Sequence, residues 1–559
     1  MMTSIELNMI QTAGIGAMAN MSAVCYKYRY TVKSFLLCIS LLLLSLPAAA
    51  DDSQPVVEMR ADRTIIYPQR MLLTGEETLM DILQMVPELM IGGYEDVLGS
   101  YTLRIDNCPV NGDDRLIIRQ MKAKDIAMIQ VCDNTGVAKG TIGLGRVLDI
   151  NMKMPDTLTG FVEARGDFGK EVEGIGTVNA LYGSKHTDLY ANVSYCYQDR
   201  SEEFLSLHMT NRFDARKRLL TYFTHQFLEL PSGTSRKALG RARYFHTFND
   251  QGTELLLVGS YQYNSNSFLS NKLPLVNAEL NTPLFSERLT MMVGVEGDYL
   301  MTSQKNTSRS WDVFNHDIYL QLTYSLPQWK FTVGNRVMFY QYKLRDADNS
   351  EKHTNTRDNA NACVIFVPNS RHQFQLGYYR KYYDPSYLVL FMDSDSRFDE
   401  TWAMAQGLLQ EWTINQFKLA YAYSTQKLTV QTEASHYIME GEQNFSEFDV
   451  AAFWKSRSLM LSGGTNLYLA KSGTFATFRV APTAYLPHHW QIGLQLVYYT
   501  DKSPIRELFG TSVYGSLSVH KQFGKRWHLG VDWHDMFDSV CRDVTLNRHA
   551  ANVKVQYRF

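Results

Sequence analysis

LYANVSYCYQ, residues 189–198, alternates apolar and polar side chains along its whole length. Because successive side chains of a β-strand point to opposite faces, this alternation separates two faces of unlike character. The apolar face comprises Leu189, Ala191, Val193, Tyr195 and Tyr197. The polar face comprises Asn192, Ser194, Cys196 and Gln198. The stretch therefore predicts a strand that lies between an apolar and a polar environment.

The same alternation continues from about Leu158 to Phe559 and divides into about 22 segments. Each segment is close to the roughly ten residues that a tilted strand needs to cross a bilayer. The formal net charge of -2 gives no indication of nucleic-acid binding. Most of the chain is therefore predicted to be strand, in contact with a lipid bilayer and with no nucleic-acid partner.

The connections between these segments alternate in length. Every second link is short, as in SKHT (184–187) and STQ (424–426). The intervening links are longer and more polar, as in LPSGTSRKALG (230–240), RDADNSEKHTNTRDN (345–359) and residues 384–406. Bacterial membrane barrels show this asymmetry, whereas a large soluble all-β protein, the alternative, would not sort its links by parity. We therefore expect a mainly β fold, a large antiparallel transmembrane β-barrel of about 22 strands.

The last segment, ANVKVQYRF (551–559), keeps the alternation to its final residue. Its apolar positions are expected to face lipid: Val553, Val555, Tyr557 and Phe559. Its polar positions are expected to face the lumen: Lys554, Gln556 and Arg558. Pairing of this strand with the first one, near residues 158–167, would leave no sheet edge exposed.

Residues 51–154 have a different sequence pattern, in which helix and strand signals are mixed. TGEETLMDILQMV (74–86) predicts a helix capped by Thr74, and a second short helix is expected at MKAKDIAMI (121–129). YTLRID (101–106), IQVCD (129–133) and RVLDINMK (146–153) predict strands. A barrel of about 22 strands encloses a lumen that would leak unless it were plugged. This small α+β region is therefore predicted to fill the lumen.

Three segments of this region resemble the plug of TonB-dependent outer-membrane receptors, of the compact kind associated with Bacteroides-like bacteria. They are TLMDILQMVPELMI (78–91), YTLRIDNCPVNGDD (101–114) and the stretch 122–153, which has a Gly-rich turn before its last strand. The resemblance implies a receptor in the outer membrane of a Gram-negative bacterium. Such a receptor takes up a scarce extracellular solute, and a TonB-type periplasmic protein supplies the energy.

The chain departs from the family pattern in places. Asn107 stands where Gly is usual, GSYTLRID (99–106) replaces an Ile-Arg-Gly motif, and no clear TonB-binding box follows the leader. These departures keep a second hypothesis open, an uncoupled structural or adhesive barrel that retains its plug. An outer-membrane hydrolase is a third, but no Ser-His-Asp arrangement supports it, and no catalytic residue is assigned.

The N-terminus carries a basic region and the apolar run KSFLLCISLLLLSLPAAADD (33–52), which predict a secretory signal cleaved after Ala50. A membrane anchor is the alternative, and residues 1–20 are expected to be an upstream extension. The predicted domains are, in chain order, a signal peptide (1–50), an N-terminal segment (51–63), a plug (64–154) and a barrel (155–559).

The candidate TonB contact is the extended stretch QPVVEMRADR (54–63), with Val56, Val57, Glu58 and Met59 at its centre. It would add a strand to a sheet edge of the partner. An ordinary lead-in strand of the plug is the alternative. Tyr557 and Phe559 form the candidate signal for the barrel-assembly machinery, which the resemblance implies reads a final aromatic.

Candidate ligand contacts lie on predicted apical loops. In the plug these residues are Tyr94, Asp96, Tyr101, Asp113 and Arg115, and in the outer loop they are Tyr387, Asp393 and Asp395. Tyr stacks on sugars and flat chelates at low entropic cost, although an interfacial belt also uses Tyr. The acidic residues lack EF-hand spacing, so a solvated loop is favoured over a calcium site. A surface lipoprotein is a further expected partner.

Five of the seven cysteines follow the leader, and none is at zinc-site spacing. A Cys108–Cys132 disulfide and scattered free thiols both remain open. We assign no metal or other cofactor.

Overall fold

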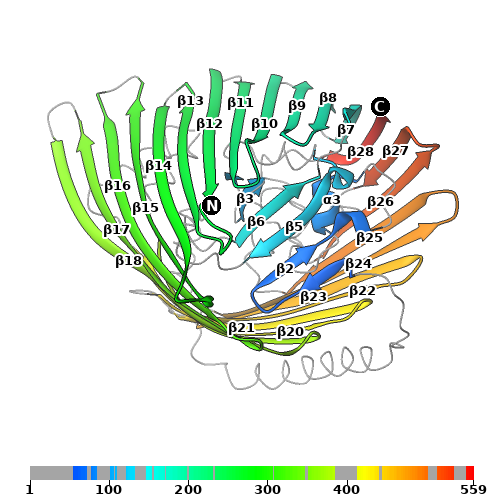
Figure 1. Cartoon of the computed structure of the whole chain (residues 1–559). Helices are drawn as coiled ribbons and strands as arrows, with labels where there is room; N and C mark the ends of the chain where they lie inside the picture. The colour runs from blue at the N-terminus through cyan, green and yellow to red at the C-terminus, as the bar shows by residue number, and fades with distance from the viewer. Residues whose placement is uncertain are drawn as a thin grey trace.

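The structure, a computed structural model, shows a small sheet inside a closed β-barrel (Figure 1). It describes the following residues: 55–71, 77–84, 101–105, 108–109, 121–132, 146–153, 157–169, 172–197, 201–230, 233–267, 269–305, 308–346, 350–383, 412–439, 444–471, 473–500, 513–533 and 549–559.

The barrel wall consists of 22 strands. The first eleven are β7 (Thr159–Gly169), β8 (Val172–Gly183), β9 (Thr187–Tyr197), β10 (Ser201–Arg212), β11 (Lys217–Leu230), β12 (Gly233–Thr247), β13 (Glu254–Ser265), β14 (Leu269–Leu284), β15 (Ser286–Gln304), β16 (Ser310–Ser325) and β17 (Trp329–Arg345). The next eleven are β18 (Ser350–Asn369), β19 (His372–Tyr383), β20 (Trp412–Ser424), β21 (Leu428–Met439), β22 (Phe445–Lys455), β23 (Leu459–Ala470), β24 (Gly473–Leu486), β25 (Trp490–Tyr499), β26 (Val513–Phe523), β27 (Trp527–Trp533) and β28 (His549–Arg558).

Each strand pairs antiparallel with its neighbours in the sequence, and β28 pairs with β7 to close the barrel. At this junction Tyr557 lies opposite Val162 and Arg558 opposite Phe161. The backbone N–H of Phe559 donates to the carbonyl of Gly160 at 3.2 Å. The predicted fold class and the predicted closing pair are therefore confirmed.

The two faces of the strands differ as the alternation predicts. On β9, Val193, Tyr195 and Tyr197 are exposed on the outer face, whereas Asn192 and Ser194 are buried toward the lumen. On β28 the outer residues Val553, Val555 and Phe559 are exposed and Lys554 and Gln556 are buried. Apolar side chains thus cover the outside of the wall, and polar side chains line much of its inside.

The two ends of the barrel differ in their connections. One end, here called the turn end, carries tight turns such as residues 184–186 and 425–427. Trp329, Trp490 and Trp527 each begin a strand there and are exposed, as an interfacial aromatic girdle requires. The opposite end is here called the loop end. Strand β28 finishes at the turn end, beside the start of β7.

Two links predicted to be long are short. Only residues 231–232 separate β11 from β12, and only residues 346–349 separate β17 from β18. The polar residues expected in loops therefore lie within strands, and residues 350–354 are exposed on both faces of β18. Where a strand projects beyond the bilayer, water contacts both faces and the hydrophobic alternation disappears. The pattern that reveals the membrane-spanning part cannot reveal this extension.

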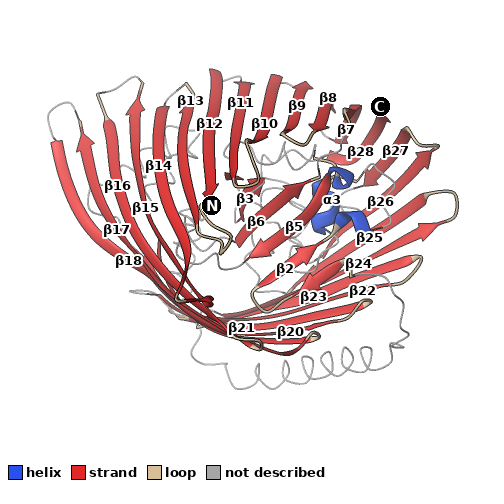
Figure 2. Ribbon diagram, viewed as in Figure 1, coloured by secondary structure: helices blue, strands red, loops and turns tan. Residues whose placement is uncertain are grey.

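The small domain, called the plug, has a sheet in the order β1-β2-β5-β6-β3-β4. Its elements are β1 (Val57–Met59), β2 (Arg63–Ile66), the 3-10 turn η1 (Pro68–Arg70), α3 (Leu79–Gln84), β3 (Tyr101–Ile105), β4 (Cys108–Pro109), the 3-10 turn η4 (Ala123–Asp125), β5 (Ile126–Cys132) and β6 (Arg146–Met152). The described helical turns lie in this domain, inside the strands of the wall (Figure 2).

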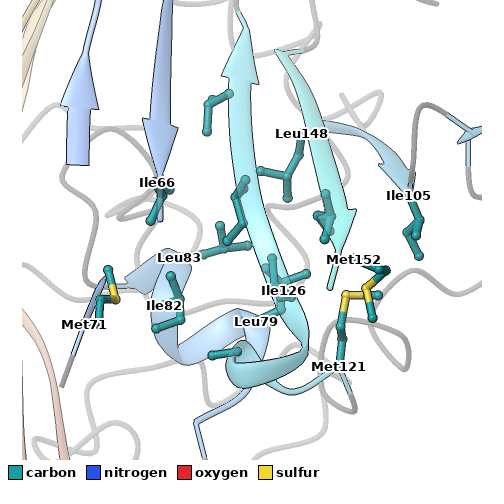
Figure 3. Close-up of a cluster of buried hydrophobic side chains, with 14 of the residues drawn as sticks. Ile66, Met71, Leu79, Ile82, Leu83, Ile105, Met121, Ile126, Leu148 and Met152 are labelled. Carbon is teal, nitrogen blue, oxygen red and sulfur yellow. The ribbon is translucent and has the colours of Figure 1, made fainter. Parts of the chain in front are cut away.

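The plug has a hydrophobic core of its own. Leu79 and Ile82 of α3 belong to one cluster with Ile126 and Leu148 of the sheet (Figure 3). All four side chains are fully buried. The helix predicted over 74–86 is present as Leu79–Gln84, and Thr74, its predicted cap, lies outside the described residues.

The second predicted helix is wrong. Residues 123–125 form a single 3-10 turn, and strand β5 begins at Ile126. The β-branched residues Ile126, Ile129 and Val131 favour the strand, and all three are buried. Cys132 on β5 and Cys108 on β4 are separated by β6 and β3 in the sheet, so the disulfide alternative is also wrong. Among the described residues, no helix is long and apolar enough to cross a bilayer.

Candidate functional site

The ligand contacts expected from the sequence fall mostly beyond the described chain. Residues outside it are Tyr94, Asp96, Asp113, Arg115, Tyr387, Asp393 and Asp395. Tyr101 begins β3 of the plug. The candidate site is therefore built from the described lumen, where the wall and the plug supply other residues.

A row of four stacked rings lines the lumen near the loop end. This aromatic ladder comprises Tyr437, Phe445, Tyr468 and Phe475, one ring from each of the strands β21 to β24. Successive ring centroids lie 4.3, 4.9 and 4.6 Å apart, with interplanar angles of 17°, 27° and 19°. The spacing follows the distance between neighbouring strands, which is about 4.8 Å. The rings are half-buried and so remain accessible to a solute.

The stacking determines which surface the ladder presents. Each inner ring stacks between two neighbours, so a solute would meet mainly ring edges along the row. Ring edges carry partial positive charge and ring faces partial negative charge. The ladder is therefore a smooth apolar wall with weakly electropositive edges.

Polar groups lie beside the ladder on strands β20 to β23. Gln416 donates to the Tyr437 hydroxyl at 3.2 Å, and that hydroxyl donates to Glu447 at 3.2 Å. Asn466 donates to Asp449 at 2.7 Å. Two carboxylates thus lie close to the rings and add hydrogen-bond acceptors to this side of the lumen.

A second aromatic cluster lies near the loop end, on strands β14 to β19. Tyr340 and Tyr342 stack with an interplanar angle of 7°, and the Tyr340 and Tyr382 rings are 5.5 Å apart. Trp311 and Leu300 pack in the same cluster, and all of these side chains are buried. The aromatic ladder and this cluster give the loop end of the lumen two apolar sectors.

A hydrogen-bonded charge network lies deeper in the lumen on strands β14 to β17. Arg336 bridges Asp317, at 2.6 Å through Nε, and Glu296, at 2.7 Å. Asn277 donates to Glu296 at 2.8 Å, and the Tyr319 hydroxyl donates to Glu279 at 3.0 Å.

A glycine makes room for the Tyr319 ring in this network. A Cβ at Gly294 would lie 2.3 Å from the Tyr319 ring, so only glycine lets that ring lie flat across β15.

Charged contacts join the plug to the wall near the closing strand. Lys122 pairs with Glu163 of β7, and both side chains are almost fully buried. Arg558 of β28 makes a bidentate pair with Asp125 of η4, with N–O distances of 3.1 and 3.3 Å. Burial, reinforced by the nearby Arg558, lowers the pKa of the Lys124 ammonium. The wall thus holds one face of the plug through specific ion pairs.

Apolar contacts hold the plug elsewhere. The hydrophobic core of the plug continues into the wall, where it includes Leu181, Tyr190, Phe204, Tyr222, Leu239, Ala451, Phe453 and Met460. These residues come from β8 to β12 and from β22 and β23. The plug is therefore packed against two sectors of the barrel rather than suspended in it.

The candidate TonB-contact residues form an edge strand of the plug. Val57, Glu58 and Met59 make up β1, which pairs with β2 and lies beside β20 and β21. Val56, Val57 and Met59 are buried.

Polar contacts pin β1 in place. The Tyr67 hydroxyl donates to Glu58 at 3.3 Å, and burial together with Glu58 raises the pKa of Tyr67. Arg70 donates to the Pro55 carbonyl at 2.8 Å. This segment is therefore folded into the plug in the present state.

The candidate assembly residues lie at the seam of the barrel. The Tyr557 hydroxyl accepts from Arg526 at 3.1 Å, and its ring lies 5.0 Å from Trp527. The Phe559 ring lies over Gly160, where an added Cβ would come within 2.7 Å of it. Among the described residues, no group of three or more His, Cys, Asp or Glu side chains could hold a metal ion.

The sequence carries a signal for the aromatic ladder that loop composition alone does not reveal. Each of its four aromatic residues lies within a few positions of a loop-end connection, on the lumenal register of its strand. A search for aromatic residues on the polar face, close to loops, would have found all four.

No protein-family model and no curated protein matches the sequence. Solved structures do match. The siderophore receptor PirA from Pseudomonas aeruginosa superposes with a TM-score of 0.67 at 12% identity, over 90% of this chain and all of that one. The alcaligin outer-membrane receptor FauA from Bordetella pertussis gives 0.63 at 11% identity, over 92% of this chain and all of that one. The ferric-catecholate import receptor Fiu from E. coli gives 0.63 at 11%, over 90% and 97%.

The chain has the fold of a TonB-dependent outer-membrane receptor. The superposition covers both the plug and the barrel, since it includes about nine tenths of the chain. The low identity restricts this conclusion to the fold and leaves the solute open. The receptor fold accounts for two features at once, a wide closed barrel and a small domain packed inside it.

Proposed function

We propose that this protein is an outer-membrane receptor of a Gram-negative bacterium that takes up a scarce extracellular solute into the periplasm. One observation carries the proposal: a separately folded plug is packed inside a closed barrel of 22 strands. A structural barrel of this width has no need of a removable plug, whereas a regulated passage does. In this orientation the turn end faces the periplasm and the loop end faces the outside.

The proposed solute enters at the loop end. The half-buried aromatic ladder supplies apolar surface, and Glu447 and Asp449 supply acceptors. The candidate contacts on the plug apex and outer loop would complete the site. Because the matched structures are named as siderophore receptors, ferric siderophores are the first solutes to test. The role is non-enzymatic binding and transport, and a surface lipoprotein over the loop end would be an accessory partner.

Energy would enter through the N-terminal segment. As the last strand of the plug sheet, β1 has one edge that does not pair with another described strand of that sheet, and strand addition to such an edge is a known mode of capture. A TonB-type periplasmic protein would engage Val56 to Met59 there and loosen β1 from β2. The burial of β1 favours the alternative of an uncoupled structural or adhesive barrel, because its side chains are not displayed for capture.

Uptake of labelled ferric siderophores by cells that lack their own receptors tests this proposal. Glu58→Pro removes a backbone N–H and disrupts β1, whereas the matched Glu58→Ala keeps the strand. We expect the proline variant to bind solute at the cell surface but to lose at least 90% of energy-dependent uptake. Uptake by the native chain that persists after the proton gradient is collapsed, or no uptake of any solute, would favour the uncoupled barrel.

We also propose that Tyr557 and Phe559 are read by the barrel-assembly machinery before β28 pairs with β7. Phe559 is exposed on the outer face and packs over Gly160. We expect Phe559→Asp to lower the assembled fraction in outer-membrane preparations, whereas Phe523→Asp, at the exposed turn end of β26, should have a smaller effect. Normal insertion of the Phe559→Asp chain would contradict this role.

A further inference from the structure

A buried arginine of the plug lacks a hydrogen-bond acceptor. Arg104 lies on β3 with only 7% of its surface exposed. Its Nε–H has no acceptor among the residues that the structure describes. Buried donors in native proteins are nearly always satisfied, and a charged donor left without an acceptor is especially costly. The Nε–H of Arg104 is therefore a buried charged donor without an acceptor among the described residues.

Two further arginines approach this position from the wall. Arg241 and Arg243 occupy alternate positions of β12, so both point toward the lumen. Both lie within electrostatic range of Arg104, as do two carboxylates, Asp149 of β6 and Glu296 of β15. Asp149 lies directly opposite Arg104 in the parallel β3–β6 pair.

Glu296, the wall carboxylate of this group, already has partners of its own. Both oxygens of Glu296 are already engaged, one by Arg336 at 2.7 Å and the other by Asn277 at 2.8 Å. Arg336 in turn also donates to the carboxylate of Asp317. Both oxygens of Glu296 therefore already accept a hydrogen bond, whereas the Nε–H of Arg104 has no acceptor within the described part of the chain.

The surroundings of Arg104 also disfavour its charged form. Burial, opposed by Asp149 and reinforced by Arg243 and Arg241, lowers the pKa of Arg104 to about 10. The group therefore remains charged at neutral pH in a site that disfavours its charge. An anion bound there would relieve that cost.

We propose that a small oxyanion of the phosphate or sulfate class binds between Arg104 of the plug and Arg241 and Arg243 of the wall. The planar fork of arginine matches the oxygen spacing of such anions and forms charge-assisted hydrogen bonds with them. These three residues are called the oxyanion site. Because they belong to two separately folded parts, a bound oxyanion joins plug to wall. Free inorganic anion and an acidic group of a passing solute share this chemistry.

Hydrogen exchange on the purified full-length protein in detergent micelles tests the site. Inorganic phosphate is titrated against chloride at constant ionic strength, and exchange is followed in peptides that cover β3 and β6. We expect saturable protection of β3 of at least fivefold, with the same result for sulfate. Arg104→Gln abolishes this protection, and Arg104→Lys, which keeps the charge but loses the fork, retains only part of it. Arg216→Gln is the matched control, because Arg216 pairs with Asp250 in an exposed turn.

A second variant separates binding from folding, since Arg104→Gln could itself loosen the plug. Arg243→Gln changes only the wall, and we expect exchange of β3 in chloride to stay at the native rate while phosphate binds at least fivefold more weakly. Protection that follows ionic strength regardless of the anion would overturn the proposal. It would also be overturned if Arg104→Gln and Arg243→Gln both titrate like the native chain.

The two sources of the oxyanion are then distinguished by competition. A carboxylate-bearing chelate that displaces phosphate from the oxyanion site assigns the site to a solute in transit, whereas a chelate that leaves phosphate bound assigns it to the inorganic ion. The readout is binding to the purified chain. A failure of the proposed transport function would therefore leave this result unchanged.

Discussion

The plug touches the barrel wall in two contrasting ways. Toward β8 to β12 and toward β22 and β23, its hydrophobic core runs on into apolar side chains of the wall. Toward the closing strands β28 and β7, it is held by the ion pairs Lys122–Glu163 and Arg558–Asp125. One small domain therefore has an apolar side and a charged side within the same lumen.

The two sides contribute differently to the docked state. Apolar burial is non-directional and stabilises by about 1.5–3 kcal/mol for each large side chain. A buried ion pair contributes little net free energy, because desolvation of the two charges offsets their attraction, but its geometry is strict. The apolar side thus keeps the plug inside the barrel, and the charged side sets its rotation. Removal of a residue should have different consequences on each side.

The largest effect is expected from one half of the most buried pair. Lys122→Met leaves Glu163 as an unpaired buried charge and should weaken plug docking by about 3–5 kcal/mol. Hydrogen exchange in β5, which follows Lys122 closely in the chain, measures the loss. The double variant Lys122→Met/Glu163→Leu removes both charges and should recover most of it. A single variant that exchanges at the native rate would show that the pair does not hold the plug.

On the apolar side, Phe453→Ala should weaken docking by about 3 kcal/mol, because it leaves a cavity where plug and wall meet. Phe453 is buried, whereas Phe448 lies on the same strand with its side chain exposed on the outer face. Phe448→Ala is therefore the matched control. Limited proteolysis of the plug in the intact barrel measures the difference, and equal cleavage of both variants would argue against this contact.

The second ion pair is partly exposed, so its effect is expected to be smaller. Asp125→Asn removes a bidentate charged contact to Arg558 and should cost about 2 kcal/mol. Asp214→Asn, in an exposed turn where Asp214 faces Lys217, should cost less than about 0.5 kcal/mol. Denaturant titrations followed by plug proteolysis would rank the two. If the order is reversed, the plug does not depend on its charged side.

The smallest effect is expected on acidification. Despite the opposing effect of burial, the hydrogen bond and charge of Arg63 lower the pKa of Asp62 below its ordinary value. A carboxyl group whose pKa is lowered in the native state stabilises that state at pH values above the ordinary carboxyl pKa of about 3.9. This stabilisation is lost as the pH falls through the lower pKa of the native state. Exchange in β2, corrected for intrinsic rates, should be constant from about pH 5 to 8 and rise below about pH 4. Asp62→Asn should remove that acid dependence.

The strands that could be predicted from the sequence are those in which each side chain faces either lipid or the lumen. Val193 and Asn192 alternate because one faces lipid and the other the lumen, so β9 and its partners could be recognised locally. The extension at Ser350 could not, because water meets both of its faces.

Contacts between residues that lie far apart in the sequence also could not be predicted from it. Lys122 meets Glu163 only after the barrel closes around the plug. The four rings of the ladder come from four strands, each with its own turn or loop between. Loop composition guided the expected ligand residues, and most of those lie outside the described chain, so they remain predictions.

Closure between β28 and β7 makes the order of synthesis matter. Strand β7 leaves the ribosome early and must wait for its partner until residues 549–558 have been made. A product cut short before His549 would keep two unpaired strand edges, and open edges invite pairing with other chains. The barrel can therefore close only in a chain that includes β28, so a truncated chain cannot form the finished wall.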